Sequence, residues 1–156
     1  MAFTIGPETP LSDDVRAMVA ALNDHLRPLS PPEFQFQLTV EQMAGVDSTV
    51  FIVRDETGAA VGMGALKAHD AELGEVKRMW TDQSLRRAGI GRLVLTAIET
   101  HAIKLNLKRL VLETGNTAGF EPAWALYERA GFRQCGAVLD YPSSDYSRFY
   151  EKQLTS

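Results

Sequence analysis

The sequence predicts a single α+β domain that spans residues 1–156, and three observations support this prediction. Short runs of β-branched and apolar residues, separated by turns, indicate strands. Apolar residues at helical spacing indicate amphipathic helices in other segments. The length of 156 residues suits one hydrophobic core, and no repeat, low-complexity tract or long linker divides the chain.

The helical segments show both apolar periodicity and recognisable ends. The predicted helices cover residues 13–26, 39–44, 90–105 and 122–130. Ser12 is a good N-cap for the first helix, which ends before the proline-rich connection 27–34. Gly131 stands where a residue with a left-handed backbone would end the last helix.

Six strands are predicted from apolar and β-branched runs. They cover residues 49–53, 60–66, 74–81, 109–114, 132–136 and 148–154. The first three are joined by short turns, so the simplest arrangement of these three is antiparallel.

The formal net charge of −4 disfavours nucleic acid as a partner, because binding to a phosphate backbone needs a dense basic face. Basic residues nevertheless gather at Lys77 and Arg78 and again within 86–92. A small anionic ligand would explain such a local patch in an acidic protein, and so would a solvated charged face.

The sequence lacks the features of a membrane protein or of a metal site. The N-terminus has no signal-peptide pattern, and no stretch approaches the roughly 18–20 apolar residues that span a bilayer. Cys135 is the only cysteine, and His25, His69 and His101 show no metal-ligand spacing. We therefore expect a cytoplasmic protein with no internal disulfide, no metal and no membrane partner.

A strand, a glycine-containing loop and a long helix follow one another between residues 75 and 105. Gly89 and Gly91 let the backbone approach a ligand, and the N–H groups at the start of a helix attract anions. The spacing of the loop matches neither a P-loop nor a dinucleotide fingerprint. The loop is therefore either a different kind of anion site or a glycine-rich turn that only begins a helix.

This loop resembles the pyrophosphate loop of the GCN5-related N-acetyltransferase (GNAT) superfamily. Arg86, Gly89 and Gly91 fill the three defined positions of its motif, Arg/Gln-x-x-Gly-x-Gly/Ala. The strand 75–80 and the ending 149–152 also resemble a bacterial subgroup of acetyltransferases without an assigned substrate. The resemblance covers most of the chain and is strongest over residues 73–133.

A second family motif supports the same resemblance. Ala123 and Tyr127, followed by Gly131 and Phe132, match an alanine and tyrosine on a helix that ends before Gly-Phe. The chain departs from the pattern at Phe120, where many members carry an asparagine that holds the pantetheine arm. Asn116 lies nearby in a different register.

The resemblance implies a mixed, twisted sheet of six or seven strands with about four helices, and two parallel central strands splayed around the coenzyme. It implies transfer of an acetyl group from acetyl-CoA, as co-substrate, to a primary amine of a small molecule. The alternatives are acetylation of a protein or peptide, and a non-catalytic acyl-CoA sensor. The resemblance also allows a homodimer.

The resemblance implies a role for several side chains in direct transfer. Glu75 would be the base that removes a proton from the amine, although it would also suit a structural ion pair with Lys77 or Arg78. Tyr127 would be the acid that protonates the leaving thiolate, although tyrosines on apolar helix faces are usually core residues. A backbone N–H at Met79 would stabilise the oxyanion.

Other positions are expected to bind the two substrates. The residues expected to contact the coenzyme are Met79, Trp80, Thr81, Arg86, Arg87, Ala88, Gly89, Ile90, Gly91, Arg92 and Tyr127. Arg27 is the candidate that would hold a carboxylate of the acceptor, such as an amino acid, and orient its amine. Alternatively, Arg27 complements the dipole of the preceding helix and points to solvent.

Overall fold

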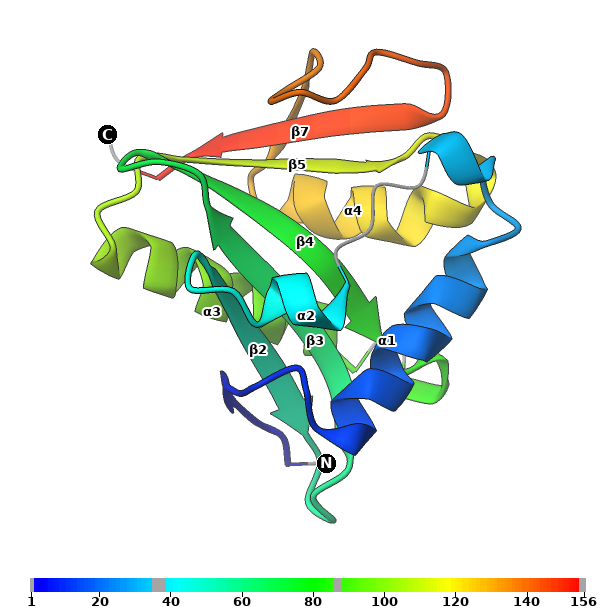
Figure 1. Cartoon of the computed structure of the whole chain (residues 1–156), viewed down its shortest axis with the longest axis vertical. Helices are drawn as coiled ribbons and strands as arrows, with labels where there is room; N and C mark the ends of the chain where they lie inside the picture. Colours follow the sequence, from blue (N-terminus) through cyan, green and yellow to red (C-terminus); the bar gives the residue numbers. More distant parts are fainter. Residues whose placement is uncertain (1, 35–38, 86–87, 155–156) are drawn as a thin grey trace.

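The computed structural model describes residues 2–34, 39–85 and 88–154. Within these residues, seven strands form one sheet in the order β1-β2-β3-β4-β5-β7-β6 (Figure 1). The strands are β1 (Thr4–Pro7), β2 (Ser48–Arg54), β3 (Ala60–Ala68), β4 (Leu73–Thr81), β5 (Arg109–Gly115), β6 (Arg133–Cys135) and β7 (Ser147–Gln153). Neighbouring strands pair antiparallel except β4 and β5, which are parallel. The predicted mixed sheet is therefore confirmed.

Four α-helices flank the sheet in the described part of the chain. They are α1 (Asp13–Leu26), α2 (Val40–Met43), α3 (Ile90–Lys104) and α4 (Glu121–Arg129). Single 3₁₀ turns lie at Pro32–Phe34, Gln83–Leu85 and Ala118–Phe120. None of the helices in these segments is long and apolar enough to cross a membrane.

The helices and strands predicted from the sequence are confirmed, with ends within two residues of the prediction. Gly131 follows the C-cap of α4 with a φ of 94°, as its position indicates. The edge strand β1 has no counterpart in the prediction. Its four residues include Gly6 and Pro7, which carry little strand propensity, so β1 depends on pairing with β2.

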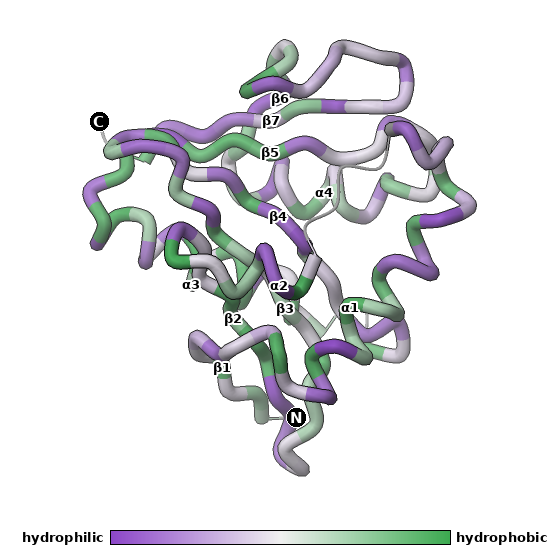
Figure 2. The backbone as a smooth tube through the Cα atoms, in the orientation of Figure 1, coloured by the Kyte–Doolittle hydropathy of each residue, from purple (hydrophilic) through white to green (hydrophobic). Residues whose placement is uncertain are grey.

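Helices cover both faces of the sheet. In Figure 1, α1 and α2 lie in front of the sheet and α3 lies behind it. The core behind the sheet contains residues of α3, α4 and the inner strands, and a second core lies between the sheet and α1 with α2. Val50 and Ile52 of β2 belong to the front core, whereas Phe51 and Val53 belong to the rear core. Burial on both faces explains why β2 is a continuous apolar run, which Figure 2 shows in green.

The parallel strands β4 and β5 pair over only part of their length. Three residue pairs join them, from Leu73 with Arg109 to Glu75 with Val111. β4 then continues to Thr81, and β5 continues to Gly115 while pairing with β7 on its other side. Figure 1 shows the two strands close together at one end and apart at the other. The predicted splay is confirmed, and it leaves a gap in the middle of the sheet.

The close approach of α3 to the sheet generates a prediction about Gly64 in β3. A Cβ atom at this position would lie 2.5 Å from Val94 Cγ1 and 2.6 Å from Met79 Sδ, so Gly64→Ala forces these side chains to move. We expect a loss of about 1–3 kcal/mol in the free energy of unfolding, measured by urea denaturation. Gly6→Ala is the matched control in β1, because no atom lies within 4 Å of its added Cβ. Equal effects of the two substitutions would contradict this account of the packing.

Candidate active site

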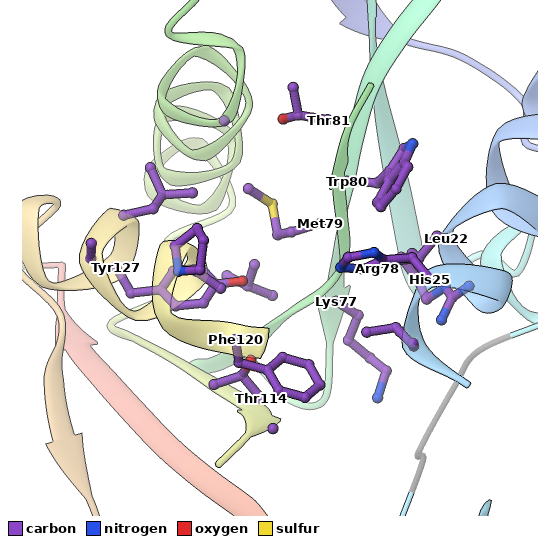
Figure 3. A pocket seen from close by; sticks show the side chains of 18 of the residues that line it. Leu22, His25, Lys77, Arg78, Met79, Trp80, Thr81, Thr114, Phe120 and Tyr127 are labelled. Atoms are coloured by element: carbon purple, nitrogen blue, oxygen red, sulfur yellow. The ribbon is translucent and has the colours of Figure 1, made fainter. Parts of the chain in front are cut away.

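A cavity of about 670 Å³ lies where β4 and β5 diverge. Its walls come from α1, β4, the start of α3, the end of β5 and α4. Figure 3 shows Met79, Thr81 and Tyr127 toward α3 and α4, and Trp80 and His25 toward α1. The volume is in the range of pockets that bind small molecules and cofactors. One side of the cavity is therefore formed by α4 and the start of α3, and another side is formed by α1.

The start of α3 forms one end of the cavity. Gly89 precedes the helix with a φ of 83°, a left-handed conformation that strains residues with a side chain. Gly91 is required for a different reason, because a Cβ there would lie 3.0 Å from Leu126 Cδ2 of α4. The first N–H groups of a helix have no partner within the helix, and they lie at its positive end. This end of the cavity can therefore hold an anion.

A β-bulge interrupts β4 beside the cavity. Met63 of β3 pairs with Trp80, whereas Ala65 pairs with Lys77, so two residues of β4 stand opposite one residue of β3. Arg78 adopts a φ of 57° within this bulge. The irregularity falls at Met79, where the resemblance implies a backbone N–H that is not used in the sheet. The oxyanion role of Met79 stays a prediction.

Tyr127 belongs both to the core and to the cavity wall. It is 5% exposed on α4 and packs against the rings of Phe132 and Tyr150, at centroid distances of 6.0 Å and 5.9 Å. Burial raises its pKa, and the nearby Glu113 and Tyr150 raise it further. The phenol therefore stays protonated at neutral pH, and its side chain lies along the cavity.

Glu75 is enclosed by polar partners. It is 2% exposed; His69 Nε2 lies 2.7 Å from one carboxyl oxygen, and Lys77 Nζ lies 3.3 Å from the other. The hydroxyl of Tyr141 donates to Glu75 and accepts a hydrogen bond from Lys77. Burial and then the hydrogen bond to Glu75 raise the pKa of Tyr141. Lys77 lines the cavity, whereas Glu75 is not among the lining residues. The ion pair between Glu75 and Lys77 is present. The role of Glu75 as base stays a prediction.

Glu113 is a functional candidate that the sequence analysis did not identify. It lies on β5, lines the cavity and accepts a 2.8 Å hydrogen bond from Ser147 Oγ. Burial raises the pKa of Glu113 to about 7; the Ser147 hydrogen bond and Lys77 oppose the shift, and Glu75 adds to it. In the sequence, Glu113 is marked only by its place directly after the apolar residues 110–112 of β5, and this does not distinguish it from an ordinary strand end. This carboxyl group can exchange a proton near neutral pH.

Most residues expected to contact the coenzyme line the cavity. They are Met79, Trp80, Thr81, Gly89, Ile90, Gly91, Arg92 and Tyr127. Ala88 is exposed immediately before α3. Arg86 and Arg87 lie outside the described residues, so their expected contacts stay predictions.

Other sequence-based candidates fall on both sides of the cavity boundary. Arg27 is 69% exposed on its side chain, pairs with Asp24 at 2.9 Å and is not among the residues that line the cavity. Phe120 lines the cavity, whereas Asn116 lies away from it and bonds to the backbone of Asp145. Within the described ranges, no group of three or more His, Cys, Asp or Glu is arranged to hold a metal ion.

Comparisons with known proteins agree with this architecture. At 40% identity over 142 residues, the chain is similar to an uncharacterized N-acetyltransferase of Bacillus subtilis, YsnE, covering 89% of this chain and 93% of the relative. It is 37% identical to an IAA acetyltransferase of Azospirillum brasilense, covering 97% of each chain. A candidate acyl-CoA N-acyltransferase from Klebsiella pneumoniae has a similar structure, with a TM-score of 0.82, 30% identity and 98% coverage of both chains.

One family model covers the glycine-containing loop, the splayed strands β4 and β5, and the helix α4 that carries Tyr127. The model of the acetyltransferase (GNAT) family matches residues 16–132, a range that contains β4, α3, β5 and α4. This range covers most of the chain and includes the walls of the cavity. The chain belongs to the acetyltransferase (GNAT) family.

Proposed function

We propose that this protein transfers an acetyl group from acetyl-CoA to a primary amine of a small molecule. The observation that carries the proposal is one cavity with two chemically different ends. The start of α3 offers N–H groups to an anion, and the gap between β4 and β5 leads to Lys77 and Glu113. The Klebsiella pneumoniae neighbour, a candidate acyl-CoA N-acyltransferase, supports the choice of donor.

In this proposal the coenzyme lies across the split in the sheet. Its pyrophosphate occupies the positive end of α3 beside Gly89 and Gly91. The pantetheine arm follows β4 past Thr81 and Trp80, and a backbone N–H at the bulge receives the thioester oxygen near Met79. Such a fixed dipole is effective because it needs no reorganisation when charge develops on the oxygen.

Tyr127 is the proposed acid for the leaving thiolate. The hydroxyl needs only to donate a hydrogen bond or a proton as negative charge forms on sulfur. Its raised pKa keeps the proton on the phenol until that stage. Ring contacts with Phe132 and Tyr150 hold the side chain in place along the cavity.

Two carboxyl groups are candidates for the base. Glu75 has the position on β4 that the family resemblance implies, but it is bonded to His69, Lys77 and Tyr141 behind the cavity wall. Glu113 lines the cavity, and its pKa of about 7 suits a group that accepts a proton near neutral pH. The geometry favours Glu113 as the direct acceptor, with Glu75 holding Lys77 and Tyr141 in position.

A small acceptor fits the cavity better than a peptide. The connection after α1 crosses to the start of the Ala118–Phe120 turn, where Thr117 Oγ1 donates a 3.0 Å hydrogen bond to the carbonyl of Leu29. Leu26, Ser30, Gly119 and Phe120 then face the cavity from both sides. This contact ties the connection after α1 to the turn before α4 at the edge of the cavity, which supports a small acceptor over a peptide. The non-catalytic sensor would not need Tyr127 and a titrating carboxyl group in one pocket.

A direct test of the proposed reaction is thiol release from acetyl-CoA in the presence of amines, amino acids and short peptides. We expect turnover with at least one small amine, and mass spectrometry of the product should show the added acetyl group on nitrogen. Turnover with peptides alone would favour the protein acceptor, and binding of acetyl-CoA without any turnover would favour the sensor.

Gly89→Asp should weaken CoA binding by at least about tenfold, measured by calorimetry. The substitution adds a side chain and a negative charge where the phosphates approach α3. Gly58→Asp is the matched control, because Gly58 has a similar φ of 88° and also has no atom within 4 Å of an added Cβ. The control carries the same backbone strain in the β2–β3 turn. Equal losses of CoA affinity in the two variants would show that the loop assignment is wrong.

Tyr127→Phe should lower kcat by about 10²-fold and change the CoA dissociation constant by no more than a few-fold. The variant lacks a proton donor that acts in the transition state, and it keeps the ring that packs in the core. Tyr150→Phe is the matched control, since Tyr150 is buried in the same cluster and its hydroxyl bonds to Glu128 instead of facing the cavity. Unchanged turnover in Tyr127→Phe, when chemistry limits the rate, would leave Tyr127 with a packing role only.

The two carboxyl groups can be separated by the pH dependence of kcat/KM. If Glu113 is the base, it is protonated below its pKa of about 7 and cannot accept a proton, so the rate falls as pH decreases through that value. Glu113→Gln should remove this limb, and Glu75→Gln should keep it at a lower overall rate. The ratio of wild-type to variant rates cancels the titration of the amine itself. Loss of the limb in Glu75→Gln alone would assign the role of base to Glu75.

A further inference from the structure

Arg78 is a buried cation on the α1 side of the cavity. It is 8% exposed, lines the cavity, and is drawn beside Leu22 and His25 in Figure 3. Its Nη2 donates to the side-chain oxygen of Asn23 on α1. Its Nε is buried and has no hydrogen-bond partner. Among the described residues, no Asp or Glu forms an ion pair with this guanidinium.

The charge on Arg78 is retained in spite of this environment. Burial lowers the pKa of Arg78 to about 10, which still leaves the guanidinium protonated at neutral pH. Buried charges are normally paired, because removing an ion from water costs several kcal/mol. A single amide oxygen from Asn23 does not neutralise the charge. An anionic group in the cavity would supply the negative charge that no described Asp or Glu provides to Arg78.

The backbone at Arg78 also departs from what its sequence prefers. A φ of 57° is uncommon for a residue with a long side chain, and glycine or asparagine would adopt it at lower cost. Strained backbone of this kind is found where the surrounding structure holds it for function. Here the bulge presents Arg78 toward α1, while the next residue, Met79, is drawn on the opposite side of β4 in Figure 3.

We propose that Arg78 binds a carboxylate of the acceptor, so that the substrate class is a small amine that also carries a carboxylate, such as an amino acid. This inference rests on the proposed function, because it concerns the acceptor of the same cavity. A guanidinium can hold a carboxylate through two parallel hydrogen bonds and thereby fix its orientation. The amine of the same molecule then lies within the cavity that Glu113 also lines.

The structure favours Arg78 over Arg27 for this role. Arg27 is exposed and already paired with Asp24, and a charge–charge contact at that depth is screened by water. Arg78 is buried at the cavity wall, where the same contact is stronger because water is excluded. Leu22 and Leu26 of α1 lie along the same wall and suit an acceptor with an apolar body.

Binding to the CoA-loaded protein tests the inference without relying on turnover. The probes are leucine, methionine and phenylalanine, each compared with its amide by calorimetry. We expect each amino acid to bind at least about tenfold more tightly than its amide, as for a lost charge-assisted contact. In Arg78→Met this ratio should fall to about one, and in Arg78→Lys part of it should remain. Equal binding of acids and amides by the wild-type protein would overturn the proposal.

Two matched variants separate Arg78 from its neighbours. Arg27→Met removes the other candidate, and Arg16→Met removes an exposed arginine of α1 that pairs with Glu41. Both should keep the preference for the acid. Loss of the preference in Arg27→Met, with retention in Arg78→Met, would assign the carboxylate to Arg27 and overturn the inference.

A second measurement does not depend on the folding of Arg78→Met. The Nε–H resonance of Arg78 in wild-type protein, assigned by its absence in Arg78→Lys, should shift on addition of phenylalanine but not of phenylalaninamide. A resonance that responds equally to both probes would contradict the proposal. Thiol release is measured in parallel. Acetylation without a preference for acids would contradict the role of Arg78 and leave the proposed reaction standing. Preferential binding of acids without acetylation would contradict the proposed reaction and leave the role of Arg78 standing.

Discussion

The separation of β4 from β5 is the constraint on which the rest of the site depends. Beyond the pair formed by Glu75 and Val111, the two parallel strands no longer share hydrogen bonds, and a cavity opens through the middle of the sheet. Unpaired backbone inside a protein is costly unless it finds other partners. An extended ligand along β4, as proposed for the pantetheine arm, would provide such partners. The same opening brings together residues from both faces of the sheet, so that α3 with α4 and α1 contribute to one site.

The partly enclosed opening also shifts the pKa values of two ionisable groups on its walls. Glu75 and Val111 form the last pair between the two strands. Lys77 lies two residues after Glu75, and Glu113 lies two residues after Val111, so each faces the same side of its strand as the residue that it follows. Because β4 and β5 are not paired at these two positions, the side chains of Lys77 and Glu113 border a cavity that is partly shielded from water. Burial raises the pKa of Glu113 and lowers that of Arg78. Glu113 therefore titrates near neutral pH. Arg78 is left as a buried cation without a carboxylate partner among the described residues.

Local signals in the sequence were sufficient for the fold, and they were insufficient for part of the site. Helical periodicity located α1 and α3, and Gly89 with Tyr127 located two walls of the cavity, because each signal depends on nearby residues. Glu113 and Arg78 could not be recognised in this way. Their importance comes from burial, from the bulge opposite Gly64 and from the distance to other charges, all of which arise only when β3, β4 and β5 come together. The weak edge strand β1 was missed for the same reason, since its pairing with β2 is tertiary.

The two glycines of the loop connect the coenzyme end of the cavity to the proposed acid. Gly89 is needed for its left-handed backbone, which precedes α3 where the start of the helix lines the cavity. Gly91 is needed for its size, because Leu126 of α4 packs against it. Leu126 immediately precedes Tyr127, so this contact fixes the distance between the start of α3 and the phenol. In the proposed complex, the pyrophosphate held by α3 and the thiolate that Tyr127 protonates belong to one coenzyme of fixed length. If the proposed arrangement holds, the packing of Gly91 against Leu126 controls whether the thioester can reach Tyr127.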